Sequence, residues 1–159
     1  MLGLLLSAGI VGAPVKVVGD WGIYRQTPTS CLMGTRDAQR GTAFLVAVDS
    51  SRPKMVVLAV GDAAWTSLTE GSSKPIQYFG NSSPFTTGKP LGYSLNGQMF
   101  LAAPAPGWEV DKAFHNSMSL SAIFEETVLF RRYSTDYDLA AFEATRQCAG
   151  LSNDPFAAR

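Results

Sequence analysis

The sequence contains few of the residues from which metal sites and acid–base catalysts are built. His115 is the only histidine, and Cys31 and Cys148 are the only cysteines. A zinc site needs several such side chains at close spacing. The sequence therefore predicts neither a metal site nor a bound cofactor.

The chain also has no excess of positive or of negative charge. Thirteen basic and thirteen acidic side chains cancel, and charged residues make up only 16% of the chain. Proteins that bind nucleic acid carry a basic surface, and no run of Lys or Arg marks a site for an anionic membrane. Neither kind of partner is expected, and the sequence gives no oligomeric state.

The motifs of nucleophilic and phosphate chemistry are absent as well. No Gly-x-Ser-x-Gly elbow occurs, and the stretch from Gly34 to Thr42 lacks the lysine and the spacing of a phosphate loop. We therefore predict no catalytic residues. A hydrolase-type enzyme using His115 with Asp111 stays open, because residues four apart share a helix face. The competing interpretation is an ordinary surface histidine.

The first residues of the sequence carry no charged side chain. Residues 2–13 are apolar, too short to span a bilayer, and similar to the apolar region of a secretory signal. We expect residues 1–14 to be a signal-like segment, 15–152 one globular domain, and 153–159 a flexible tail. The mature protein would be periplasmic or secreted, without stable transmembrane insertion. The alternative is a segment of the mature fold, because no Lys or Arg precedes the apolar run.

Short apolar runs separated by turn residues predict about seven or eight strands. They are expected at 15–26, 30–33, 42–48, 55–60, 76–79, 91–95, 98–102 and 127–130. Asn96-Gly97 is the clearest hairpin signal, since both residues tolerate the positive φ of a type I′ turn. Ala103 to Gly107 should break the strand that follows, and Gly80 to Pro90 should be an exposed loop. Strands followed by helices, without βαβ alternation, indicate an α+β domain built mainly on antiparallel sheet.

Two helices are expected late in the chain. Apolar residues have helical spacing in the first part of the stretch from Val110 to Phe124. A C-terminal helix should begin near Asp136 and stop at Gly150. It should pack on the sheet through Phe142, which shares a stripe with residues three and four positions away.

The two cysteines are predicted to form a disulfide. Cys31 falls in a short early strand and Cys148 at the end of the last helix, from which a side chain can reach the sheet. In an oxidising compartment their pairing would join the first strands to the last helix. The alternative is two buried free thiols in a cytosolic protein.

Aromatic residues crowd the middle of the chain. Trp65 and Trp108 lie next to loop signals, and Tyr93 falls in the predicted hairpin. Exposed aromatics near loops are typical of sites that bind peptides, glycans or proteins, so these three residues are candidate binding residues. The alternative is packing in the core, which is usual for large aromatic side chains.

The order of several landmarks resembles a known family. These landmarks are Asp20-Trp21-x-Ile23 leading to Cys31, then Trp65-x-x-Leu68-x-x-Gly71, Phe114-x-x-x-Met118-x-x-x-Ala122, and a short helix ending in Cys148. Over residues 17–148 the pattern is similar to small exported alphaproteobacterial proteins of the invasion-associated locus B type. The resemblance implies a periplasmic or secreted β-rich domain without an established enzymatic activity. This chain has fewer cysteines than that family, and no catalytic residue is carried over.

Three hypotheses of function follow. The first is a small exported, non-catalytic domain that binds a protein or a component of the cell envelope. The second is an envelope inhibitor or chaperone-like factor acting through an exposed loop such as Gly80 to Pro90, which rests on analogy at the level of the fold. The third is the enzyme that uses His115.

Overall fold

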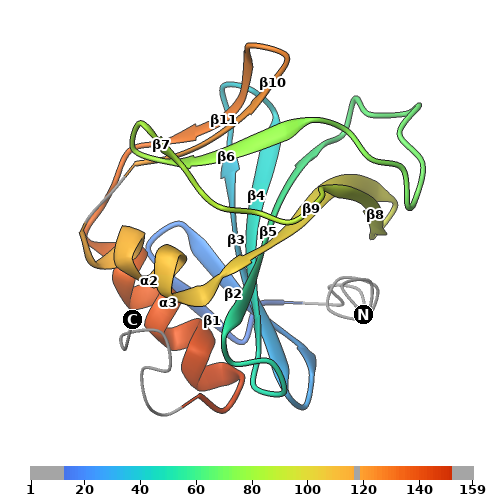
Figure 1. Ribbon diagram of the computed structural model, residues 1–159. Helices are drawn as coiled ribbons and strands as arrows, with labels where there is room; N and C mark the ends of the chain where they lie inside the picture. Colours follow the sequence, from blue (N-terminus) through green and yellow to red (C-terminus); the bar gives the residue numbers. More distant parts are fainter. Residues whose placement is uncertain (1–12, 117–118, 152–159) are drawn as a thin grey trace.

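The computed structural model describes residues 13–116 and 119–151. Figure 1 shows two helices on one side of a large twisted sheet and a smaller sheet crossing near its end. Most of the signal-like segment, the predicted tail and Met118 of the family pattern lie outside the described residues. The described residues include no helix with the length and apolar character that crossing a membrane requires.

The large sheet has seven strands, and every neighbouring pair is antiparallel. Across the sheet they are β1 (Lys16–Val18), β2 (Trp21–Thr27), β3 (Ser30–Asp37), β4 (Thr42–Asp49), β5 (Met55–Asp62), β9 (Gln98–Pro106) and β8 (Leu91–Leu95). Asn96 and Gly97 have φ of 51° and 76° between β8 and β9, so the predicted hairpin is confirmed. The predicted pairing of residues 42–48 with 55–60 is also confirmed, by β4 and β5.

The small sheet has four strands, also antiparallel. Across it they are β11 (Thr127–Arg132), β10 (Leu120–Phe124), β6 (Ile76–Gly80) and β7 (Ser83–Pro84). The Thr42 hydroxyl donates a 2.6 Å hydrogen bond to the Leu129 carbonyl, which joins the edge of this sheet to β4. The two sheets therefore pack as layers of one unit.

The described residues form eleven strands, more than the seven or eight predicted. Residues 15–26 are two strands because Gly19, with φ of 61°, turns the chain between β1 and β2. The other additions are β7, within the predicted 80–90 loop, and β10. With two helices in the same residues, the fold is mainly antiparallel sheet and not a balanced α+β domain.

The two helices are α2 (Gly107–His115) and α3 (Tyr137–Cys148). The prediction of a helix continuing from Val110 toward Phe124 is wrong in its second part, because Leu120–Phe124 pairs with β6 and β11 as β10. Phe142 of α3 is fully buried and stacks on Phe114 at 4.8 Å between ring centroids. The prediction that the last helix packs through Phe142 is confirmed.

The predicted strand break at Ala103 to Gly107 is wrong. β9 continues to Pro106, and its last paired residues face β5. Pairing with β8 stops at Ala102. Pro104 points its backbone away from β5, where its carbonyl accepts a hydrogen bond from Gly88 at 2.8 Å. Proline is tolerated there because the missing N–H has no ladder partner on that side.

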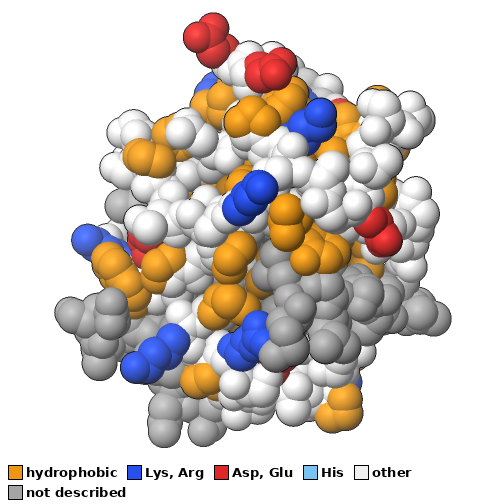
Figure 2. Space-filling view, turned by 45° about the vertical axis from the view of Figure 1, so that its right-hand side comes forward, with side chains coloured by type: hydrophobic (Ala, Val, Ile, Leu, Met, Phe, Trp, Pro, Cys, Tyr) orange, Lys and Arg blue, Asp and Glu red, His pale blue; other side chains and the backbone are white. Residues whose placement is uncertain are grey.

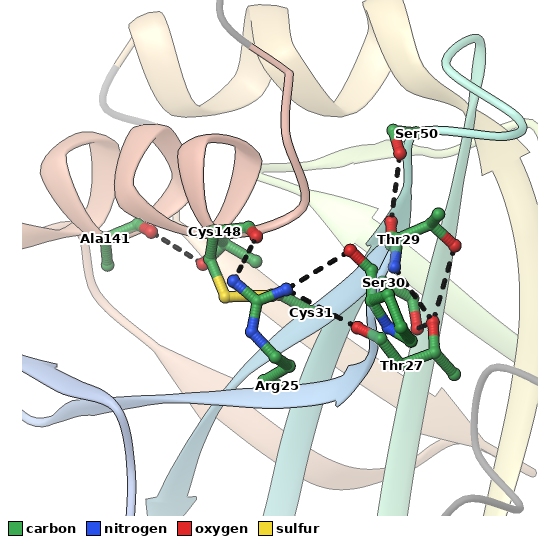
Figure 3. Close-up of a disulfide and its surroundings, with 10 residues drawn as sticks. Arg25, Thr27, Thr29, Ser30, Cys31, Ser50, Ala141 and Cys148 are labelled. Atoms are coloured by element: carbon green, nitrogen blue, oxygen red, sulfur yellow. Dashed lines mark hydrogen bonds between the residues drawn. A yellow bond between two sulfur atoms is a disulfide. The ribbon is translucent and has the colours of Figure 1, made fainter.

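The predicted disulfide between Cys31 and Cys148 is present, with the Cα atoms 6.0 Å apart. Figure 3 shows the bond joining β3 to the end of α3. Beside it, Arg25 of β2 donates a 2.8 Å hydrogen bond to the Cys148 carbonyl, one of the unpaired carbonyls at the helix end. The last helix is thus attached to the early strands by a covalent bond and a charged donor.

Candidate functional site

Two of the three predicted binding aromatics lie against the core between the layers. Trp65 follows β5, is partly buried, and lines a cavity of about 190 Å³ with Leu68 and Lys74. Trp108 is in the first turn of α2, is also partly buried, and lines a separate cavity of about 170 Å³. Each residue therefore packs against the core and stays partly accessible.

Tyr93, the third aromatic, lies elsewhere. It is in β8, pairs in register with Phe100 of β9, and packs against a second apolar cluster that Trp65 and Trp108 do not join. The structure therefore does not bring the three aromatics into one patch. A binding role for each of them stays a prediction.

The proposed catalytic pair is in contact but is tied to a structural ion pair. His115 Nδ1 lies 3.3 Å from Asp111 Oδ1, and the His115 side chain is 43% exposed. The same Asp111 oxygen accepts a 2.9 Å hydrogen bond from Arg146, a buried residue of α3. Neither His115 nor Asp111 lines the cavity beside Trp65 or the cavity beside Trp108. The geometry supports a link between α2 and α3 more directly than it supports catalysis.

A second polar network fixes α3 to the sheets. Arg132 donates two hydrogen bonds to Asp138, at 2.6 and 3.0 Å, and forms a bidentate pair with Asp20. The buried Trp21 ring donates from Nε1 to Asp138 at 2.9 Å. Because each buried polar group has a charged or hydrogen-bonding partner, the network offsets the cost of its own desolvation.

The charges in this network shift two pKa values. Partial burial alone would raise the pKa of Asp20, but the hydrogen bonds and charge of Arg132, with a hydrogen bond from Thr35, hold it below its usual value. Burial alone would lower the pKa of Arg132, whereas its hydrogen bonds and charge interactions with Asp20 and Asp138 raise it. Both shifts favour the charged forms, as expected of a structural ion pair.

The large sheet has two apolar faces. We call inner the face toward the helices and the small sheet, and outer the face that carries Leu32, Leu45, Val57 and Phe100. Antiparallel sheets commonly alternate apolar and polar residues, but every residue from Thr42 to Val48 is buried. β4, a central strand, therefore has buried side chains on both faces of the sheet.

The floor of the outer face is built from small residues. In register across the sheet, Gly34 of β3 lies beside Leu45 of β4, then Ala59 of β5 and Ala102 of β9. A Cβ added to Gly34 would lie 2.8 Å from the Leu45 side chain. The absence of a side chain at Gly34 therefore leaves the space that the Leu45 side chain occupies.

A cavity of about 500 Å³ opens on this floor. Its apolar lining includes Leu45 and Phe100, and polar side chains of Asp20, Arg36 and Gln98 also line it. An apolar floor with a few polar groups is the usual composition of a binding site. The arrangement therefore suits a ligand with an apolar body that reaches polar groups at its edge.

Gln98, like Gln26, has a buried side-chain atom without a hydrogen-bond partner among the described residues. It begins β9 and lines this cavity, and its Nε2 is buried with no hydrogen-bond partner among the described residues. An unsatisfied buried donor costs about 1–3 kcal/mol. An acceptor placed on the outer face, such as a peptide carbonyl, would remove that cost.

The outer cluster is built by one sheet alone. Its buried members are Leu32, Ala43, Leu45, Ala47, Val57, Ala59, Leu95, Phe100 and Ala102, and Tyr24, Met55 and Tyr93 pack around them. All twelve belong to the seven-stranded sheet, so within residues 13–116 and 119–151 no helix and no strand of the small sheet joins this cluster. Figure 2 turns the right-hand side of Figure 1 forward and shows hydrophobic side chains in groups among single charged ones.

The sequence prediction missed this face. Residues 42–48 and 55–60 were predicted as a strand hairpin, with 42–48 a central strand, but no apolar face was predicted on their second side. The signal that was available is the lack of polar alternation in both strands. Of the candidate binding residues, Tyr93 alone packs against the outer cluster.

In the described residues no group of three or more His, Cys, Asp and Glu side chains could hold a metal ion. The chain matches no protein-family model, no curated protein and no solved structure. The resemblance to invasion-associated locus B proteins therefore stays a prediction.

Proposed function

We propose that this protein is an exported, non-catalytic domain that binds an extended apolar segment of a protein in the cell envelope. The binding surface is the outer face of the seven-stranded sheet. The observation that carries the proposal is an apolar cluster to which no other described element contributes a residue. Its nine buried members come from one sheet, whereas the core of a domain is usually formed between two packed layers.

The disulfide supports the export part of the proposal. Bonds between cysteines persist in oxidising compartments such as the periplasm and the extracellular space, and they are rare in the cytosol. The Cys31–Cys148 bond joins distant parts of the chain within the core, so it belongs to the folded domain. A periplasmic or secreted location agrees with this bond.

A protein segment suits the face better than a compact ligand does. The floor runs across β3, β4, β5 and β9, so it is broad and shallow. Small side chains such as Ala59 and Ala102 leave space for large apolar side chains of a partner, and Gln98 offers a donor to a backbone carbonyl. An extended peptide supplies both kinds of group along its length.

A chaperone-like role is compatible with the same face, because chaperones bind apolar segments of unfolded clients. The 80–90 loop is a weaker candidate for this role. Phe85 in that loop belongs to the inner cluster, and the Gly88 N–H donates to Pro104 at 2.8 Å, so the loop is anchored to the domain. The 3.3 Å contact of His115 with Asp111 favours an enzyme less, because the same Asp111 oxygen also pairs with Arg146.

The proposal is tested with protein recovered from the envelope or medium of its native host. The probe is a permanently unfolded apolar client, reduced and carboxymethylated lactalbumin, and binding is measured by fluorescence anisotropy. We expect saturable binding that weakens about tenfold, which is 1.4 kcal/mol, in the variant Tyr24→Ser/Tyr93→Ser. The matched control is Tyr133→Ser, since Tyr133 is 72% exposed and lies outside the outer cluster. Absence of binding by the native protein would overturn the proposal.

A further inference from the structure

The small sheet has one face that does not belong to the core. Tyr78 of β6 and its register partner Ala122 of β10 are members of the inner cluster. Phe79 and Ile123, the residues that follow them, belong to neither apolar cluster. Because side chains alternate along a strand, Phe79 and Ile123 lie on the opposite face of the small sheet. Both are half-buried, so two large apolar side chains stay partly accessible on this face.

A groove of about 730 Å³ opens on the same face. Phe79 and Ile123 line it together with Gln77, and the chain segment 87–90 supplies a further part of the lining. None of its described lining residues lines the cavity on the outer face of the large sheet or belongs to the outer cluster. The groove is therefore a candidate site separate from the outer face.

Two carboxylates also line this groove. Glu125 and Glu126 form the two-residue turn between β10 and β11, and both side chains are exposed. Within the described part of the chain neither of them forms an ion pair. Lys89 is a further lining residue, so one negative charge remains in excess. Figure 1 shows the β10–β11 turn at the top of the molecule, where Figure 2 shows acidic side chains above a group of hydrophobic ones.

The two glutamates occupy a turn that favours other residues. Both have positive φ, at 48° and 65°, close to the 51° and 76° of Asn96 and Gly97 in the β8–β9 hairpin. Asn-Gly is the preferred pair for such two-residue turns, whereas a glutamate side chain disfavours the left-handed region. The same molecule thus forms one turn from the preferred pair and the other from two carboxylates. The local backbone gives no reason for glutamate there, which leaves the negative charge as the property that the turn supplies.

We infer that this groove binds an extended segment of a partner protein in which a large apolar side chain is followed by lysine or arginine. The apolar side chain packs against Phe79 and Ile123, and the basic side chains pair with Glu125 and Glu126. Charge complementarity favours this segment over an acidic one. The inference goes beyond the proposed function, because it assigns a second site to a different sheet and to a different class of segment.

The test measures binding of a synthetic peptide to the oxidised 159-residue chain by fluorescence anisotropy. The probe is a labelled peptide in which one leucine precedes two lysines, with glycines at both ends. The variant Glu125→Gln/Glu126→Gln should bind this probe about fivefold more weakly, which is about 1 kcal/mol for two exposed ion pairs. The variant Glu125→Asp/Glu126→Asp keeps both charges and should bind like the unmodified chain. The difference between the Gln variant and the unmodified chain should vanish in about 1 M salt.

Three controls assign the binding to this groove. The outer-face variant Tyr24→Ser/Tyr93→Ser should bind the probe like the unmodified chain. Glu143→Gln removes an exposed negative charge from α3 and should also leave binding unchanged. A probe with glycine in place of its leucine should bind about tenfold more weakly, because it loses the apolar contact. Equal binding of the two probes would mean a purely ionic contact and would overturn the inference.

A stability measurement separates binding from folding. The variant Glu125→Asn/Glu126→Gly should have a higher urea midpoint, because it installs the pair that the turn prefers, and should bind the probe as weakly as the Gln variant does. A midpoint that falls or stays unchanged would show that the glutamates serve the fold, and would overturn the inference. Equal binding by the unmodified chain and the Gln variant, or no binding by either, would also overturn it. So would micromolar calcium alone shifting the amide NMR signals of Glu125 and Glu126, since the turn would then hold a metal ion.

Discussion

The two faces of the seven-stranded sheet are both apolar, but they are covered in different ways. On the inner face, α2, α3 and the small sheet add their own residues to the cluster, including Phe114, Phe142, Tyr78 and Phe130. On the outer face, every described member of the cluster comes from the sheet itself. The inner face is therefore a domain core, and the outer face has the apolar character of a core but only one described layer.

The inner face is also fixed by bonds that the outer face lacks. The disulfide joins α3 to β3, and Arg132 joins β11 to Asp138 of α3 and to Asp20. On the outer face, Gln98 Nε2 has no partner among the described residues. The disulfide and the Arg132–Asp138 ion pair therefore both act on the inner side of the sheet.

The disulfide carries the largest expected effect. The variant Cys31→Ser/Cys148→Ser should lose about 4–5 kcal/mol of unfolding free energy, because the bond closes a long loop in the unfolded chain. Urea denaturation of the variant and of the oxidised protein measures the difference. Chemical reduction of the unmodified protein serves as the control and should produce a similar loss. A loss under about 1 kcal/mol would mean that the bond does not stabilise the inner side.

Truncation of one large side chain on each face compares the two directly. Phe142→Ala should cost about 3–5 kcal/mol, because Phe142 is fully buried between Phe114 and the guanidinium of Arg146. Leu32→Ala on the outer face should cost less, about 2–3 kcal/mol, at the low end of the range for a buried leucine. Both values come from urea denaturation of the oxidised protein. An equal or larger cost at Leu32 would show that the outer face is packed as firmly as the inner one.

Local signals in the sequence predicted the β8–β9 hairpin and much of the inner side. Asn96-Gly97 gave the hairpin, because its positive φ values depend on those two residues alone. The apolar stripe through Phe142 predicted that α3 packs on the sheet, and the presence of only two cysteines predicted the disulfide. Each of these features follows from a short stretch of chain or from a pair with no competing partner.

Features that depend on distant strands were not predicted. Residues 120–124 continue a helix-like spacing in the sequence, yet pairing with β6 and β11 makes them a strand. The turn that follows uses Glu125 and Glu126 at φ of 48° and 65°, with no Asn or Gly to mark it. The outer face was missed for a related reason, because its residues come from β2, β3, β4, β5, β8 and β9 and meet only after the sheet has formed.

The smallest expected effect is a loss of unfolding free energy at acidic pH. The pKa of Asp20 is held below its ordinary value of 3.8 because Arg132 and Thr35 stabilise its charged form against the opposing effect of burial. For a carboxyl group with a lowered pKa in the folded state, the stabilisation is complete above the unfolded value and is lost as the pH falls through the folded value. This contribution should therefore be constant at neutral pH and should decline from about pH 4 downward.

The variant Asp20→Asn isolates this contribution. At pH 7 it should be slightly less stable than the unmodified protein, because the Asp20 side chain is 55% exposed and water and salt screen its pair with Arg132. Below pH 4 the difference between the two proteins should shrink toward zero, as the unmodified protein loses the charge that the variant never had. Urea midpoints measured from pH 7 to pH 3 check this convergence. If the difference in urea midpoint stays constant over this range, the ion pair of Asp20 with Arg132 makes no charge-dependent contribution to stability.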